Sequence, residues 1–275
     1  MAIKFSFMTW VCPDWTLERI VNVAKRYGYH GVEIRTEVGH AHGIEPETDK
    51  STLEEAKKLF DDNGIEVSAV ASSCFFSQAD PEERKRMIER AKLHIELAST
   101  LGCKNVRVFG GAIPEGVSMD EAKKYIADSL RELGEFAQPM DVYVLLETHD
   151  AFSRSRDAVD VIKLVSHKHV GILWDVQHPY THGETLEEAF ENVSQYVRHC
   201  HIHDVKREGN EWKLCLLGEG EISHEFVIRK LLEIDFDGHL SGEFINPQWE
   251  AEFILKQYAE TLHRYLEQAM EHKGA

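Results

Sequence analysis

Four successive short segments in the second half of the chain, two of them mainly apolar, carry side chains that can bind a metal or transfer a proton. The segment VYVLLE ends in Glu147, VGILWD ends in Asp175, RHCHIHD holds three histidines, and HLSGEF contains Glu243. An ionisable group inside a buried strand is costly unless it is paired or binds a metal. The recurrence therefore predicts a functional site to which each of four neighbouring strands contributes one ligand.

The chemistry that this set of side chains favours is divalent metal binding. Three carboxylates and an imidazole in a half-buried pocket repel one another and raise the carboxyl pKa values, unless a cation lies between them. Oxygen and nitrogen ligands without sulfur suit Mn²⁺, Co²⁺, Mg²⁺ or Zn²⁺ equally well. The structural alternative is that the same charges form salt bridges with basic side chains, namely Arg35, Arg107, Lys206 and Arg207.

The histidines at positions 199, 201 and 203 occupy every second position of their segment. In an extended strand all three rings point to the same side, about 6.5 Å apart along the strand. Their spacing alone leaves open which of them is the ligand. His199 would lie deeper, and His203 would lie nearer the rim, where it could contact substrate or orient a ligand.

These residues need a scaffold in which neighbouring strands end at the same edge. Short aliphatic and β-branched runs alternate along the chain with longer runs of helical period, which is typical of a parallel sheet wrapped by helices. The predicted strands cover residues 3–10, 31–36, 66–73, 105–111, 142–148, 170–175, 198–204 and 239–244. Several predicted helices begin with Ser, Thr or Asp followed by Glu three residues later, and Gly28, Gly64 and Gly102 follow three of them, as helix caps do.

Eight such units of about 30 residues each predict an α/β fold, a (β/α)8 TIM barrel, and a single TIM-barrel domain over residues 1–275. In this fold the active site lies at the carboxyl ends of the strands, where the four charged positions fall. The structural alternative is an open doubly wound sheet, which normally has a glycine-rich turn after its first strand. The corresponding segment here is TWVCPDWT, which has no glycine.

The composition of the chain indicates which binding partners and which cellular compartment to expect. The net charge of -17, from 48 acidic and 31 basic residues, disfavours nucleic acid. No apolar stretch approaches the roughly 20 residues that cross a bilayer, and the N-terminal segment has no cleavage site for export. The five cysteines are scattered without a C-x-x-C pair. We therefore expect a cytoplasmic protein with reduced thiols and no membrane partner.

The chain resembles the sugar isomerase and epimerase superfamily with a xylose isomerase-like TIM barrel, which includes inosose isomerases and ketose 3-epimerases. The resemblance rests on YGYHGVEIR, LLETHD, WDVQHP, HIHDVK, LGEGEI and DGHLSGEF, in this order. It implies that one divalent metal ion is bound by Glu147, Asp175, His201 and Glu243, because the family's ligand is the histidine that begins H-x-x-D. By the same resemblance, His178 and Arg207 contact substrate.

The implied activity is isomerisation or epimerisation of a sugar or polyol ketone through a metal-stabilised enediolate. Glu147 and Glu243 would act as general base and general acid on either side of the substrate. Return of the proton to the same carbon from the opposite face gives an epimer, and its return to the neighbouring carbon gives an isomer. His149 is expected to face the pocket and contact substrate, and His203 is a further candidate substrate contact.

Three other functions compete with this one. A metal-dependent lyase or dehydratase of a keto-cyclitol or 3-keto sugar would begin with the same proton abstraction. A DNA repair endonuclease like endonuclease IV needs additional metal ligands that AVASSC, VRVFGG and EWKLCLL lack. A barrel that only binds a metabolite would tolerate loss of the two glutamates. The metal, the particular sugar and its phosphorylation stay open, and relatives that form dimers or tetramers make a homo-oligomer compatible with the resemblance.

Overall fold

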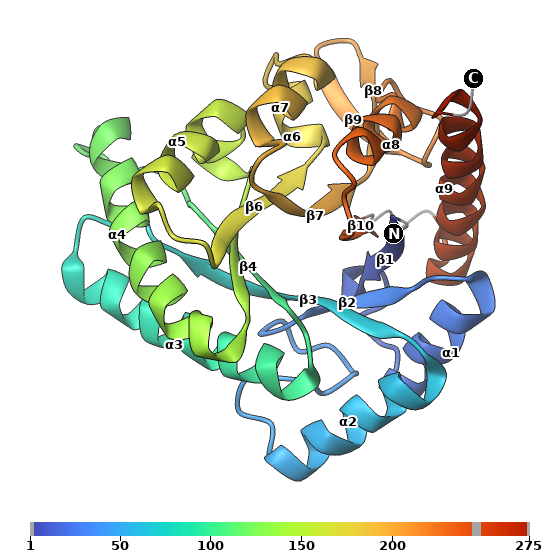
Figure 1. The fold of residues 1–275 in the computed structure, drawn as a ribbon, viewed down its shortest axis with the longest axis horizontal. Helices are drawn as coiled ribbons and strands as arrows, with labels where there is room; N and C mark the ends of the chain where they lie inside the picture. The colour runs from blue at the N-terminus through green and yellow to red at the C-terminus, as the bar shows by residue number, and fades with distance from the viewer. Residues whose placement is uncertain (1–2, 244–248, 274–275) are drawn as a thin grey trace.

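Eight parallel strands form a closed barrel, which confirms the predicted (β/α)8 architecture. The computed structural model describes residues 3–243 and 249–273. Around the barrel the strands follow the order β1-β10-β7-β6-β5-β4-β3-β2, and helices surround them (Figure 1). The barrel strands are β1 (Lys4–Met8), β2 (Gly31–Arg35), β3 (Glu66–Phe75), β4 (Asn105–Phe109), β5 (Tyr143–Glu147), β6 (Val170–Asp175), β7 (Val197–Ile202) and β10 (His239–Gly242).

The helices follow the strands and cover the outside of the barrel. They are α1 (Leu17–Tyr27), α2 (Lys50–Asn63), α3 (Pro81–Leu101), α4 (Met119–Ala137), α5 (Ser155–Val165), α6 (Gln177–Thr181), α7 (Leu186–Val193), α8 (His224–Glu233) and α9 (Ala251–Lys273). Three short 3-10 turns occur at Thr9–Val11, Gln138–Met140 and Asp150–Phe152. No helix within residues 3–243 and 249–273 has both the length and the apolar character that a bilayer span requires.

The helix ends follow the local signals in the sequence. Gly28, Gly64 and Gly102 end α1, α2 and α3 in the left-handed conformation, with φ of 76°, 66° and 73°, as helix C-caps that favour glycine do. Capping boxes begin α4 at Ser118 and α7 at Thr185. These caps fix where each helix begins and ends.

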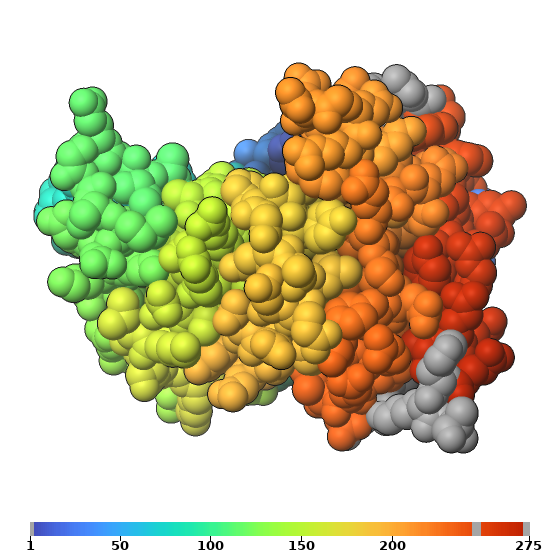
Figure 2. All heavy atoms as spheres, turned by 90° about the horizontal axis from the view of Figure 1, so that it is seen from above, coloured from blue at the N-terminus to red at the C-terminus, as the bar shows by residue number. Residues whose placement is uncertain are grey.

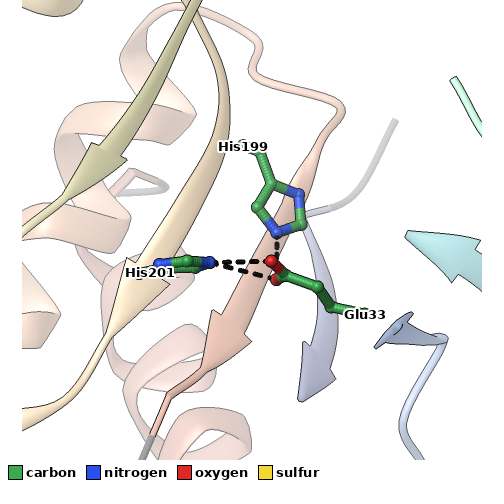
Figure 3. Close-up of side chains that lie close together, drawn as sticks. All are labelled: Glu33, His199 and His201. Atoms are coloured by element: carbon green, nitrogen blue, oxygen red, sulfur yellow. Dashed lines mark hydrogen bonds and ion pairs between the residues drawn. The ribbon is translucent and has the colours of Figure 1, made fainter. Parts of the chain in front are cut away.

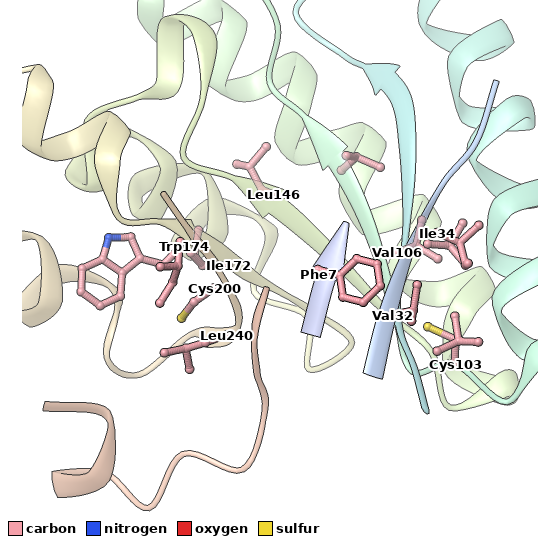
Figure 4. Packing of buried hydrophobic residues seen from close by; sticks show 14 of the residues in the cluster. Phe7, Val32, Ile34, Cys103, Val106, Leu146, Ile172, Trp174, Cys200 and Leu240 are labelled. Carbon is pink, nitrogen blue, oxygen red and sulfur yellow. The ribbon is translucent and has the colours of Figure 1, made fainter. Parts of the chain in front are cut away.

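The two faces of the barrel strands differ sharply in polarity. On β2, Val32 and Ile34 pack in the apolar layer between strands and helices, as Cys200 does on β7 (Figure 4). The alternate residues point into the barrel, where Glu33 of β2 reaches His201 of β7. TIM barrels usually fill this interior with branched aliphatic side chains. Here the apolar layer outside the barrel supplies the main hydrophobic core, and part of the interior is ionisable.

The segment between β7 and α8 contains a hairpin, most of which lies outside the predicted strands. Strands β8 (Asp204–Glu208) and β9 (Glu211–Cys215) pair antiparallel and stand outside the barrel sheet. Seen from above, the orange hairpin projects from the surface on one side of an indentation (Figure 2). The segment was not predicted as strands because four of the five residues of β8, and Glu211 and Lys213 of β9, are charged.

Asp204 connects this hairpin to the barrel. Its buried carboxylate accepts hydrogen bonds from the backbone N–H groups of Val205, Gly218, Gly220 and Ile222, at 2.9–3.2 Å. A side chain at Gly220 would collide with this carboxylate, because an added Cβ would lie 2.1 Å from Asp204 Oδ1. The aspartate therefore organises the whole turn that follows β9.

We expect Asp204→Ala to lower the free energy of unfolding by roughly 3 kcal/mol or more, because it leaves buried N–H donors without an acceptor. Urea unfolding followed by circular dichroism measures this change. The matched control is Asp128→Ala, which removes an exposed carboxylate that pairs with Arg131 on the surface of α4. Its effect is expected to stay within about 0.5 kcal/mol. Equal effects of the two substitutions would contradict the role of Asp204.

Candidate metal and catalytic site

The four predicted metal ligands converge at the carboxyl ends of their strands. Glu147 ends β5, Asp175 ends β6, His201 lies on β7, and Glu243 directly follows β10. Strand register explains the convergence, because His201 is paired with Asp175 on one side and with Ser241 on the other. One ligand atom from each of the four residues lies within 4.8 Å of the others.

The imidazole of His201 is the centre of this cluster. Its Nδ1 lies 3.0 Å from Glu147 Oε1 and 2.9 Å from Glu243 Oε2. On the opposite edge of the ring, Nε2 lies 3.0 Å from Glu33 Oε1. Burial disfavours a charged ring, but these three carboxylates outweigh it and raise the pKa of His201 well above its usual value. His201 in turn lowers the pKa of Glu243 to about 2, although burial acts in the other direction.

One oxygen of Glu147 lacks a full partner. Glu147 Oε2 is buried and accepts no hydrogen bond, and the closest cation is Arg107, with Nε at 3.4 Å. The guanidinium of Arg107 also stacks over Phe109, at 4.0 Å from the ring centroid. Four basic residues were considered as alternative salt-bridge partners of the cluster. Among the residues that the structure describes, Arg107 is the one of these four that forms an ion pair with a cluster carboxylate. A buried carboxylate oxygen with spare acceptor capacity fits a metal ligand.

The carboxylate of Asp175 is held by two histidine rings and by backbone N–H groups of the residues that follow it. Its Oδ2 lies 2.8 Å from His203 Nε2 and 3.8 Å from His178 Nε2. Its Oδ1 accepts hydrogen bonds from the backbone N–H groups of Gln177 and His178, at 2.8 and 3.1 Å. Burial would raise the pKa of Asp175, but His203 and then His178 lower it below its ordinary value. The carboxylate is therefore ionised and fixed in position.

Three of the four predicted substrate contacts form a row of rings beside the cluster. The ring centroids of His149 and His178 lie 4.3 Å apart, and those of His178 and His203 lie 6.1 Å apart. Phe109 continues the row, at 4.8 Å from His149. Burial lowers the pKa of His178, which favours a neutral ring despite the nearby Asp175. These rings offer hydrogen-bonding edges and apolar faces next to the proposed metal ligands.

Arg207, the fourth predicted substrate contact, lies elsewhere. It is exposed on β8, its backbone N–H donates to Glu221 Oε1 at 2.8 Å, and its guanidinium lies 5.3 Å from the Trp212 ring centroid. It lines a groove of about 880 Å³ between the α6–α7 segment and the hairpin, together with Tyr180 and Phe226. The described lining of this groove includes none of the four clustered ligands, so a role for Arg207 in substrate binding stays a prediction.

Glu33 was not predicted as part of the site, and His199 was predicted only to lie deeper than His201. Both are completely buried, and Glu33 connects the two histidines of β7. The rule that a charge inside a buried strand needs a reason also applies to the predicted strand at residues 31–36. Applied there, it would have marked Glu33 as a site residue.

The arrangement can do two things chemically. Three carboxylates and one imidazole provide the oxygen and nitrogen ligands that a divalent cation accepts. Glu147 and Glu243 come from β5 and β10, on either side of β6 and β7 in the barrel order. They can therefore exchange protons with a ligand held between them.

Comparisons with known proteins agree with this architecture. A family model described as xylose isomerase-like TIM barrel matches residues 21–268. An inosose isomerase from Bacillus velezensis is 25% identical over 263 residues, which cover 89% of this chain and 90% of the relative. The two chains therefore correspond over nearly their full lengths.

Solved structures share the fold. The crystal structure of IolI protein with a zinc atom bound has a TM-score of 0.84 at 22% identity, covering 97% of this chain and 99% of its own. The probable 3-DHS dehydratase AsbF from Bacillus anthracis has a TM-score of 0.79 at 21% identity, covering 95% and 99%. Because the family model matches most of the chain, this protein belongs to the family of xylose isomerase-like TIM barrels.

Proposed function

We propose that this protein is a divalent-metal-dependent isomerase or epimerase of a sugar or polyol ketone. The observation that carries the proposal is the convergence of Glu147, Asp175, His201 and Glu243 within 4.8 Å at the carboxyl end of the barrel. Active sites of TIM barrels are built at this end. The proposed cofactor is one ion of Mn²⁺, Co²⁺, Mg²⁺ or Zn²⁺.

The relatives support the class of reaction. The match to the inosose isomerase covers 89% of this chain. This similarity favours a small sugar-related ketone as substrate. The IolI structure holds zinc in the same fold, which favours a metal in the cluster described above. The sequence identity to each of these two proteins is below 30%. The class of substrate is therefore proposed together with the activity.

The proposed mechanism uses two carboxylates for proton transfer. A bound divalent cation would polarise the carbonyl and the adjacent hydroxyl and stabilise the negative charge that develops when the intervening C–H loses its proton. One of Glu147 and Glu243 removes this proton and the other supplies one. Supply to the same carbon from the opposite face gives an epimer, whereas supply to the neighbouring carbon, together with transfer of the hydroxyl proton to the former carbonyl oxygen, gives an isomer.

The row of rings beside the cluster is proposed to hold the substrate. His178 and His203 present hydrogen-bonding edges next to Asp175, and His149 packs against His178. Such edges can bind sugar hydroxyls, whose orientation decides which C–H faces each glutamate. Arg207 would contact only a substrate that reaches from the cluster to the hairpin.

A second candidate function is elimination of water on the same site. The fold shared with the AsbF dehydratase favours this alternative, and elimination begins with the same proton abstraction. The products distinguish the two reactions. A panel of ketoses and keto-cyclitols incubated with Mn²⁺ gives a new sugar if the protein is an isomerase or epimerase, and an absorbing enone if it is a dehydratase.

We predict that Mn²⁺ binds more tightly as the pH rises from 6 to 8. Three carboxylates raise the pKa of His201 in the metal-free protein, so the cation competes with the proton on this ring. The protonated form dominates below the raised pKa, and the apparent Kd should therefore fall by up to about tenfold per pH unit. Isothermal titration calorimetry in two buffers of different ionisation enthalpy measures the affinity and the released proton. An affinity that does not change with pH would exclude this competition.

We predict that Glu147→Gln and Glu243→Gln each reduce turnover at least roughly a hundredfold, because the amide cannot transfer the proton. Deuterium uptake from solvent into candidate ketoses, followed by NMR, reports the proton transfer directly. Glu135→Gln, on the exposed face of α4, is the matched control and should keep full activity. Full exchange in both site variants would remove the glutamates from the mechanism.

A further inference from the structure

Glu33 lies inside the barrel between two histidines of one strand. Its Oε2 lies 2.9 Å from His199 Nε2, and its Oε1 lies 3.0 Å from His201 Nε2 (Figure 3). All three side chains have no exposed surface. Of the three, only His201 belongs to the cluster of proposed metal ligands.

The carboxylate reaches its partners across the barrel interior. In the barrel order β1 and β10 separate β2, which carries Glu33, from β7, which carries the histidines. The intervening strands contribute small side chains at this level. Ser6 of β1 is paired in register with Gly31 of β2 and with Ser241 of β10, and Ser241 is paired with His201. Both serine side chains are buried.

The hydrogen bond at Nε2 determines what the other edge of the His201 ring can do. A carboxylate can only accept, so Nε2 must carry the proton in this contact. In a neutral ring the lone pair is then on Nδ1, which is the atom that faces Glu147 and Glu243. A second partner of this kind orients the ring of a metal-binding histidine and increases its basicity.

We infer that Glu33 is a positioning residue that holds His201 in the tautomer and orientation needed to present Nδ1 to a cation. His199, two residues before His201 on the same strand, donates a hydrogen bond to the same carboxylate. Two rings therefore fix the position of the Glu33 carboxylate. The inference rests on the proposed metal site, and it adds a residue from β2 to a set contributed by β5, β6, β7 and β10.

An alternative function for the same three residues is to bind a second metal ion, because their potential ligand atoms also lie within 4.8 Å of one another. The separations of 2.9–3.1 Å between Glu33 and the ring nitrogens are those of direct hydrogen bonds. A cation between them would need these contacts to open. We therefore favour the positioning role, and the number of ions bound tests the difference.

The first experiment is Zn²⁺ titration of the metal-free protein by calorimetry. Glu33→Gln keeps the shape of the side chain, but its amide cannot accept from both histidines as the carboxylate does. We expect one Zn²⁺ ion per wild-type chain and an affinity ten- to a hundredfold lower in the variant. The matched control is Glu66→Gln. Glu66 also contacts a histidine, with His239 Nε2 at 3.4 Å, but it is the first residue of β3 and lies at the amino end of the barrel, away from the cluster. Its Zn²⁺ affinity should match that of the wild type.

The second experiment observes His201 itself. In the Zn²⁺-loaded wild-type protein, ¹⁵N and ¹H NMR should show nitrogen coordination through Nδ1 and an exchange-protected, downfield Nε2–H proton. This proton should shift upfield and exchange faster in Glu33→Gln. A merely structural role of Glu33 would change the thermal midpoint without moving either signal. The wild-type spectrum tests the inference even if the variant folds poorly.

The outcomes separate the two proposals. A wild-type protein that binds no Zn²⁺ at the cluster would overturn the proposed metal site and this inference with it. Wild-type binding with equal affinity in Glu33→Gln, coordination through Nε2, or two ions per chain would each overturn the role of Glu33 alone. These results would not contradict the proposed metal site or the proposed proton transfer by Glu147 and Glu243.

Discussion

The concentration of negative charge inside the barrel is the constraint on which the rest of the site depends. Four carboxylates, from Glu33, Glu147, Asp175 and Glu243, approach the histidines at positions 199, 201 and 203 within about 3 Å. Buried carboxylates stay ionised only when positive or donating groups surround them. In the metal-free protein the imidazoles, with Arg107, supply that compensation. A cation of the kind proposed would take over part of it from the proton on His201.

Such a polar interior is possible because the barrel does not depend on it for its hydrophobic core. Strand alternation sends Val32, Ile34 and Cys200 outward into the layer beneath the helices (Figure 4), whereas the intervening residues face inward. Burial of apolar area between sheet and helices drives folding. The inner face is then free to carry chemistry, provided that each polar group finds a partner. The separation of the two faces is thus the physical reason that one short strand can serve both purposes.

The sequence predicted those features that are decided locally. Strand and helix positions follow from periodicity and from caps such as Gly28 and Gly64, and the clustering of the four predicted ligands follows from the topology of a barrel whose strands end at one edge. The contact of Glu33 with His201 could not be read in the same way, because the partners lie 168 residues apart and their strands are not neighbours. The position of Arg207 depends on a hairpin whose charged residues concealed its strands.

The three alternating histidines at positions 199, 201 and 203, two on β7 and one directly after it, show how position along the chain gives one residue type different contacts. His199 contacts Glu33 alone among the interior carboxylates that the described residues provide, and His203 contacts Asp175 near the rim. His201 lies between them and contacts Glu33 with one nitrogen and Glu147 and Glu243 with the other. A ring has only two nitrogens, so the partner on one edge decides the protonation of the other. A single imidazole therefore connects the carboxylate deep in the barrel with the two carboxylates near its opening.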